Sequence, residues 1–160
     1  MMKRTLISAL ALVACFVGIQ AQTQVIAHRG FWKTEGSAQN SITALEKAAE
    51  AQLYGSEFDV LMTSDGIIVV NHDNTIEGMA IPETPFKKLK KLKIKNGEKL
   101  PTLKSYLKKG KKLDIQLILE AKPLPTKEME DQAIATIVKM VKKMGLEKQV
   151  EYISFSLNMC

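Results

Sequence analysis

The chain has 160 residues, enough for one domain, and 46% of them are hydrophobic, which is ordinary for a packed core and excludes a low-complexity or fibrous protein. The formal net charge is +6 at pH 7. Twelve lysines and a single acid, Glu98, lie between Phe86 and Lys112, so the positive charge is concentrated in that segment.

The first 21 residues have the layout of a secretory signal peptide. Met1 to Arg4 carry two positive charges, Thr5 to Ile19 are almost wholly apolar, and Ala21 supplies a small residue for cleavage. The apolar run of about 15 residues is short for a membrane span, which needs roughly 20. We therefore expect an exported protein, periplasmic or secreted, with a signal peptide at 1–21 and one domain at 22–160.

Cys15 offers an alternative route to the cell envelope. Leu12-Val13-Ala14-Cys15 resembles a bacterial lipoprotein box in which Cys15 carries the lipid, although the apolar run continues past it to Ile19. The second cysteine, Cys160, is the final residue, so the exported domain has no internal pair for a disulfide. Cysteine chemistry is thereby excluded as the function.

The domain is predicted to begin with a short strand, Val25 to Ala27, that ends in His28-Arg29-Gly30. A helix follows after a loop, because its apolar residues recur at helical spacing: Ile42, Leu45, Ala49 and Leu53. Asn40 stands just before this helix, where it suits either an N-cap or a role in a site.

Gly55 to Asp73 is predicted to form two strands joined by a tight turn, with turn chemistry in Ser64-Asp65-Gly66. Alternate residues of a strand share a face, so Glu57 and Asp59 point the same way. Two close carboxylates raise each other's pKa unless a cation or basic group holds them. Either this face is a strand edge in water, or the pair belongs to an oxygen-ligand site for a divalent metal.

An irregular segment with a turn at Asn96-Gly97 is predicted to run from Asp73 to Pro101. Thr102 to Lys109 then reads as a short helix closed by Gly110. The remaining predicted elements are a strand over Leu113–Leu119 followed by Glu120-Ala121-Lys122, a helix capped by Thr126 and ended by Gly145, and a strand over Val150–Phe155.

Strands alternating with helices predict a parallel α/β sheet, either a barrel or an open doubly wound sheet. The barrel is favoured because barrel enzymes build their sites where strand ends converge, and because no Gly-rich phosphate loop is present. The polar residues assigned to the carboxyl ends of different strands are His28, Glu57, His72 and Glu120. We count five of the roughly eight strands of a (β/α)8 TIM-barrel type fold and therefore expect an incomplete barrel.

Short motifs, in a fixed order, carry a resemblance to a known family. They are His28-Arg29-Gly30, Gln39-Asn40-Ser41, Glu57-Phe58-Asp59-Val60, Asp65-Gly66, Val69-Val70-Asn71-His72-Asp73, Leu100-Pro101-Thr102-Leu103 and Glu120-Ala121-Lys122. From about Val25 to Ser156 the chain resembles the glycerophosphodiester phosphodiesterase family, which is related to the phosphatidylinositol-specific phospholipases C. The resemblance implies a (β/α) barrel that hydrolyses a small-molecule glycerophosphodiester to sn-glycerol 3-phosphate and an alcohol, usually with Ca²⁺ or Mg²⁺.

The resemblance also implies the residues that bind metal and phosphate. Glu57, Asp59 and Glu120 would be the metal ligands, and their hard oxygens suit Ca²⁺ or Mg²⁺. Arg29 and Lys122 would bind the substrate phosphate and neutralise the charge that builds up in the transition state.

His28 and His72 would be the catalytic acid/base pair, because imidazole titrates near neutrality. In the family the attacking group is the substrate's own glycerol hydroxyl, which gives a cyclic phosphate that water then opens. The chain departs from the family at Ala38-Gln39-Asn40, where Pro-Glu-Asn is common, so a carboxylate near the site is lost. An arginine often found shortly after the His-Asp pair is also missing between Thr75 and Met79.

Length is the largest departure, since a complete barrel of this type needs roughly 250 residues. We expect a C-terminally truncated domain whose unpaired strand edges at Val25 and Val150 invite association. The alternative function is a catalytically inactive protein that binds glycerophosphodiesters or anionic lipid, with Lys87 to Lys112 in peripheral contact with a membrane. Nucleic acid is disfavoured as a partner because the lysine-rich segment holds few aromatic residues for base stacking.

Overall fold

The computed structural model describes residues 23–159. The predicted signal peptide, Cys15 and Cys160 lie outside the described residues. In chain order the elements are β1 (Ile26–Ala27), α1 (Ile42–Glu50), β2 (Gly55–Met62), β3 (Ile68–Val70), β4 (Thr75–Ile76), β5 (Met79–Ala80), the 3₁₀ helix η1 (Ile81–Glu83), α2 (Phe86–Leu89), α3 (Leu103–Leu113), β6 (Gln116–Ala121), α4 (Lys127–Met144) and β7 (Val150–Ser154).

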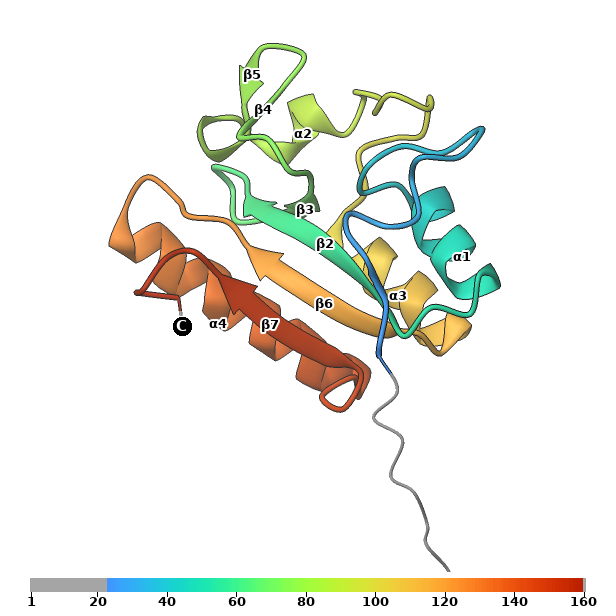
Figure 1. Ribbon diagram of the computed structural model, residues 1–160. Helices are drawn as coiled ribbons and strands as arrows, with labels where there is room; N and C mark the ends of the chain where they lie inside the picture. The colour runs from blue at the N-terminus through green and yellow to red at the C-terminus, as the bar shows by residue number, and fades with distance from the viewer. Residues whose placement is uncertain (1–22, 160) are drawn as a thin grey trace, which may run out of the picture.

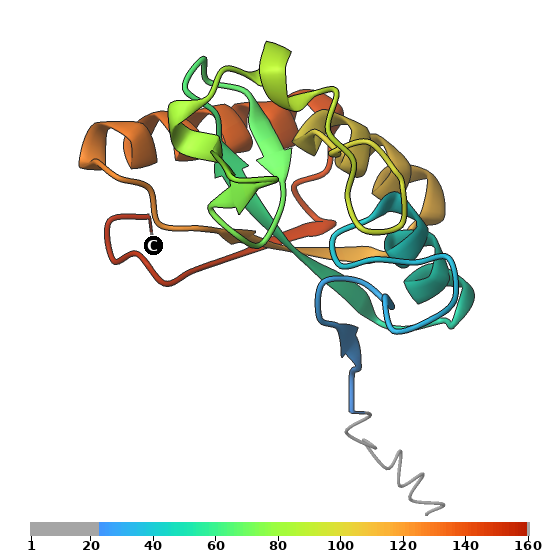
Figure 2. The ribbon, with the colours of Figure 1, turned by 90° about the horizontal axis from the view of Figure 1, so that it is seen from above.

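The main sheet has the strand order β1-β2-β6-β7, and all neighbours along this path are parallel. The helices α1, α3 and α4 lie along one face of the sheet (Figures 1 and 2). Within the described residues the sheet is open, with β1 and β7 at its edges. The predicted α/β class with a mainly parallel, unclosed sheet is therefore confirmed.

The two strands joined by a tight turn are confirmed, but the second of them, β3, is not one of the parallel barrel strands among which it was counted. β3 pairs antiparallel with β2, with Val60 opposite Val70 and Met62 opposite Ile68. A tight turn can join only antiparallel neighbours, since a parallel partner needs a long crossover connection. The described chain thus has four parallel strands of barrel type, and the strand before His72 is the return arm of a hairpin.

The sequence predicted that Gly110 ends α3, but Gly110 lies inside this helix. The helix continues to Leu113, and Asp114 ends it in the left-handed conformation with φ of 51°. A Cβ atom at Gly110 would lie 2.7 Å from Leu117 Cδ1 of β6. This glycine therefore allows the helix to pack closely against the sheet. The predicted caps of α4, Thr126 and Gly145, are confirmed.

The segment from Asp73 to Pro101 contains β4, β5, η1 and α2 and packs over the β2–β3 hairpin. Its buried apolar residues join Leu61 and Val69 of that hairpin in a second hydrophobic cluster: Ile76, Ile81, Leu89 and Leu100. Of the twelve lysines between Phe86 and Lys112, all except Lys109 are exposed. No helix within residues 23–159 is long and apolar enough to cross a membrane. Peripheral membrane contact through Lys87–Lys112 stays a prediction.

Glu98 fastens this segment to the start of α1. Its carboxylate accepts hydrogen bonds from the backbone N–H groups of Ile42 (2.9 Å) and Thr43 (3.2 Å) and from the side-chain amide of Asn96 (2.7 Å). Burial alone would raise the pKa of Glu98, but the hydrogen bonds from Thr43, Asn96 and Ile42 outweigh it and hold the pKa below its usual value.

We predict that Glu98→Ala lowers the free energy of unfolding by about 1 kcal/mol, the typical cost of losing a helix N-terminal cap. Because the pKa is lowered by folding, this contribution is present above the ordinary carboxylate pKa of 4.5 and is lost as the pH falls through the folded-state value. Urea unfolding of both proteins at several pH values between 7 and 3 measures the difference. If the difference in unfolding free energy between the two proteins does not shrink toward acid pH, the hydrogen bonds from α1 to the Glu98 carboxylate do not stabilise the fold.

β7 presents apolar side chains at one edge of the described sheet. Tyr152 and Ile153 are each 45% exposed, and Phe155 just beyond the strand is 82% exposed. Unpaired strand edges with apolar side chains favour pairing with another chain segment. Association through this edge stays a prediction.

Candidate active site

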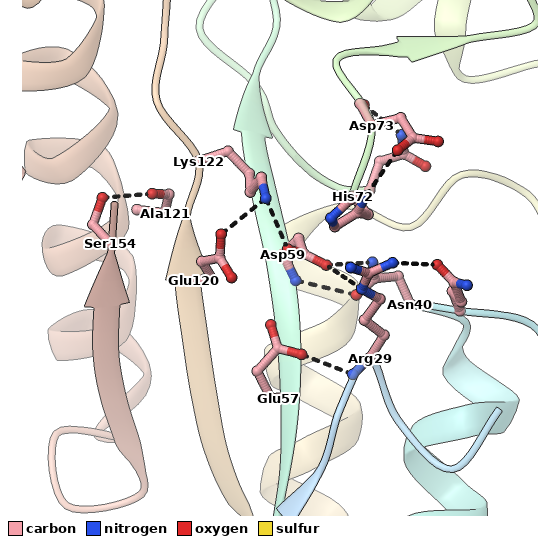
Figure 3. Close-up of polar contacts among 12 residues, drawn as sticks. Arg29, Asn40, Glu57, Asp59, His72, Asp73, Glu120, Ala121, Lys122 and Ser154 are labelled. Carbon is pink, nitrogen blue, oxygen red and sulfur yellow. Dashed lines mark hydrogen bonds and ion pairs between the residues drawn. The ribbon is translucent and has the colours of Figure 1, made fainter. Parts of the chain in front are cut away.

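Three acidic side chains meet on the central strands (Figure 3). Glu57 and Asp59 lie two residues apart on β2, and Glu120 of β6 is the direct register partner of Asp59. One oxygen from each carboxylate lies within 4.8 Å of the others. The exposed fractions of the three residues are 6%, 0% and 6%, so the alternative of a strand edge facing water is wrong. We call these three residues the carboxylate cluster.

The sequence predicted Glu57 at the carboxyl end of its strand, and this prediction is wrong. β2 continues beyond it to Met62, because its second half pairs with β3. Glu120 does lie near the end of β6, and His28 directly follows β1, as predicted. The carboxylate cluster forms because parallel register aligns Glu120 with Asp59, and Glu57 shares their side of the sheet.

Two cationic side chains neutralise part of the charge of the carboxylate cluster. Arg29 Nε lies 3.8 Å from Asp59 Oδ2, and Lys122 Nζ lies 2.9 Å from Glu120 Oε1 and 3.5 Å from Asp59 Oδ1. Glu57 Oε2 accepts a 2.7 Å hydrogen bond from the backbone N–H of Arg29. The other oxygen, Glu57 Oε1, is buried and has no hydrogen-bond partner among residues 23–159. Two cations thus face three carboxylates.

The imbalance is visible in the pKa of Glu57. Burial, followed by repulsion from Asp59, raises the pKa of Glu57 to about 7, although the backbone N–H of Arg29 opposes the shift. Burial also disfavours a charged Lys122, but Glu120 and Asp59 outweigh it and raise the pKa of Lys122. Lys122 is therefore a cation at neutral pH, and a further positive charge would stabilise ionised Glu57.

Asn40 joins the loop before α1 to the carboxylate cluster. Its side-chain N–H donates to Asp59 Oδ2 (2.9 Å), and its side-chain oxygen accepts from the backbone N–H of Asp59 (3.1 Å). The N-cap of α1 is Ser41, whose hydroxyl accepts from the N–H of Ala44. Of the two roles that the sequence left open for Asn40, the site role is the one that its contacts support.

We predict that Asn40→Ala lowers the free energy of unfolding by about 2–3 kcal/mol, since each lost hydrogen bond contributes about 1 kcal/mol and alanine disfavours the left-handed backbone by about 1 kcal/mol. The backbone φ of Asn40 is 61°. Gln52 is exposed and has φ of 53°, so Gln52→Ala controls for the backbone effect alone. Urea unfolding compares the two variants. Equal losses would contradict a structural role for the contacts with Asp59.

Residues 28–160 match the model of the glycerophosphoryl diester phosphodiesterase family. The chain belongs to this family. It is 37% identical over 94 residues to a glycerophosphodiester phosphodiesterase of Caldanaerobacter subterraneus, a match that covers 51% of this chain and 38% of the relative. Human glycerophosphodiester phosphodiesterase 1 is 33% identical over 93 residues, a match that covers 49% of this chain and 28% of the human protein. The chain thus spans less than half the length of these curated relatives.

Solved structures of glycerophosphodiester phosphodiesterases share the fold. One from Parabacteroides distasonis matches with a TM-score of 0.84 and 54% identity, over 86% of this chain and 58% of that protein. A phosphodiesterase from Oleispira antarctica, in complex with the product sn-glycerol-3-phosphate, matches with a TM-score of 0.75 and 27% identity. This match covers 86% of this chain and 59% of that protein. These likenesses confirm the TIM-barrel type, of which the described sheet is a part.

The two histidines of this family member are placed differently. His28 has a side chain that is 70% exposed, with Nε2 at 3.9 Å from Glu57 Oε2. His72 Nδ1 lies 2.7 Å from Asp73 Oδ1, a contact that orients the ring and leaves Nε2 for proton exchange. Within residues 23–159 His72 forms no hydrogen bond or ion pair with the carboxylate cluster, but it lines the same pocket as Asn40. Figure 3 shows the His72 ring beside Asp59 and Asn40.

Sequence reasoning gave no role to Asp73, which orients His72, or to Gln39. Gln39 Oε1 accepts a 2.9 Å hydrogen bond from Arg29 Nη1. The family motif has a carboxylate at the position of Gln39, so this chain keeps an acceptor for Arg29 but loses a charge. Asp73 directly follows His72, and Gln39 directly precedes Asn40. These positions beside predicted site residues were the signal in the sequence that could have identified them. The roles assigned to the two histidines, Arg29, Lys122 and the carboxylate cluster stay predictions.

Proposed function

We propose that this protein hydrolyses glycerophosphodiesters to sn-glycerol 3-phosphate and an alcohol, with a divalent cation at the carboxylate cluster. The observation that carries the proposal is the set of three buried carboxylates between Arg29 and Lys122. Membership of the glycerophosphoryl diester phosphodiesterase family supports the reaction. The product bound in the Oleispira antarctica protein supports a small-molecule substrate.

The donor set suits Ca²⁺ or Mg²⁺. Glu57, Asp59 and Glu120 offer only hard carboxylate oxygens, the ligands that both cations prefer. Glu57 Oε1 is buried without a hydrogen-bond partner among residues 23–159, and Arg29 and Lys122 leave one carboxylate charge uncompensated. Bound there, the cation would supply Lewis acidity toward the phosphoryl oxygens.

Arg29 and Lys122 would bind the non-bridging phosphate oxygens. Both are oriented before substrate arrives, Arg29 by Gln39 and Asp59, and Lys122 by Glu120 and Asp59. Fixed cations stabilise the charge that develops on those oxygens without reorganisation during the reaction.

His28 and His72 would move the protons. One imidazole accepts the proton of the attacking hydroxyl, and the other donates a proton to the leaving alcohol. The attacker in this proposal is the glycerol hydroxyl of the substrate: its oxygen bonds to phosphorus while the bond from phosphorus to the head-group oxygen breaks. Water then opens the resulting cyclic phosphate to sn-glycerol 3-phosphate.

Release of glycerol 3-phosphate from glycerophosphocholine and glycerophosphoethanolamine tests this proposal. We expect release that stops on addition of chelator and returns when Ca²⁺ or Mg²⁺ is restored. Release that ignores chelator would overturn the metal assignment. Substrate binding without turnover, at any cation concentration, would instead favour the inactive binding protein.

A further inference from the structure

A pocket of about 250 Å³ adjoins the candidate active site. Three segments line it: the loop before α1, the stretch from Asn71 through β4 to Glu77, and the turn that follows α2. Its lining includes Asn40, which holds Asp59, and the predicted catalytic residue His72. It also includes Lys93 and Lys95, to which the proposed reaction gives no role.

The two lysines stand on an ordered turn. Lys93 forms an antiparallel bridge with Lys99, and the N–H of Ile94 donates to the carbonyl of Glu98 at 2.8 Å. Ile94 packs against the second hydrophobic cluster, and Glu98 ties the turn to the N-terminus of α1. The backbone that carries both lysines is thus fixed relative to the pocket.

Lys93 and Lys95 bring two positive charges to one side of this pocket. The acids of its lining are Asp73 and Glu77, and the Asp73 carboxylate is already in contact with His72 Nδ1. Among residues 23–159 neither Lys93 nor Lys95 forms an ion pair. The turn after α2 therefore brings to the pocket two ammonium groups without an ion-pair partner in the described part of the chain, and a negatively charged ligand group would be stabilised beside them.

We propose that this pocket is a subsite for the head group of glycerophosphodiesters whose alcohol carries an additional negative charge, such as a carboxylate. The inference rests on the proposed function, because the reacting phosphate would lie between the carboxylate cluster and His72. The volume is below the roughly 300–1,000 Å³ of pockets for drug-sized ligands, which suits a small head group without acyl chains. Lys93 and Lys95 would select the substrate without taking part in the chemistry.

Glycerophosphoserine and glycerophosphoethanolamine test this subsite, because their head groups differ by one carboxylate. We expect a higher kcat/KM for the serine compound. The double variant Lys93→Met/Lys95→Met should lower the serine-to-ethanolamine ratio about three- to tenfold, as expected for the loss of two solvent-exposed charge contacts. The ratio of the unaltered protein should also fall as salt is raised.

Lys90→Met/Lys91→Met is the matched control, since both lysines are exposed in the same segment but lie outside the pocket lining. A ratio that survives Lys93→Met/Lys95→Met, or that the control lowers equally, would overturn the subsite. Calorimetry in the presence of chelator measures the dissociation constants of the two compounds, and their ratio reports selectivity in binding alone. If neither compound is turned over, the proposed function fails, and the ratio of dissociation constants alone then decides whether the subsite stands.

Discussion

Replacing Glu57 with glutamine should remove cation-dependent activity and make the cation-free protein more stable at pH 8. Glutamine keeps the size and a hydrogen-bonding oxygen of the side chain but cannot carry its negative charge. Loss of one of the three carboxylates of the cluster is expected to lower activity about 100-fold or more, since even outer-shell partners of metal ligands contribute 10–100-fold.

The gain in stability follows from the pKa of Glu57, which burial and Asp59 raise from 4.5 to about 7. A raised pKa means that the fold favours the protonated side chain, so the contribution of Glu57 to stability is fully present below pH 4.5 and is lost as the pH rises through 7. At pH 8 the ionised side chain should cost about 3 kcal/mol, or about 10 °C in melting temperature, and Glu57→Gln avoids this cost.

Melting temperatures at pH 5 and pH 8, with chelator or with added Ca²⁺ or Mg²⁺, measure both effects. With chelator, Glu57→Gln should melt above the wild type at pH 8 and close to it at pH 5. Added cation should stabilise the wild type but not the variant. Glu83→Gln, at an exposed glutamate, is the control and should change neither result. A variant that melts below the wild type at pH 8 would contradict an uncompensated Glu57 carboxylate.

His72→Ala should lower kcat about 10²–10⁴-fold, the range in which a general acid or base contributes. The melting temperature should change little, because the His72 side chain is 32% exposed and its polar contact is with the exposed carboxylate of Asp73. Asp73→Asn should give a smaller loss, since the ring stays but loses the carboxylate that contacts its Nδ1.

Single-turnover rates with glycerophosphocholine, measured beside circular dichroism spectra, check this prediction. His28→Ala should fall in the same range, because the pair shares the two proton transfers. Full activity in either histidine variant would exclude that residue as acid or base. A variant that loses its folded spectrum together with its activity would contradict the expectation that His72 is dispensable for the fold.

The carboxylate cluster could be predicted in part because its geometry is local. Two residues of a strand that are two positions apart share a face, so Glu57 and Asp59 were placed together from sequence alone. Their pairing with Glu120 depends on the parallel register of β2 and β6, which no local pattern encodes. The motif resemblance, and not periodicity, supplied that third residue.

The errors in the fold have equally specific causes. The count of five barrel strands included β3, although the predicted tight turn at Ser64-Asp65-Gly66 implies an antiparallel hairpin arm and not a parallel barrel strand. Glycine is a common helix terminator, yet Gly110 is required by the approach of Leu117 from β6, a contact absent from any local pattern. The subsite with Lys93 and Lys95 depends on three distant segments and could not be predicted from sequence.

A crystal structure of the protein grown with Mn²⁺, with anomalous scattering used to locate the ion, tests the central claim most directly. Mn²⁺ prefers the same oxygen ligands as Mg²⁺ and Ca²⁺. We predict one anomalous peak bound by Glu57, Asp59 and Glu120, and its loss in Glu57→Gln. The claim that the carboxylate cluster holds a divalent cation would be contradicted if no peak lay there. This requires crystals of protein that releases glycerol 3-phosphate from glycerophosphocholine.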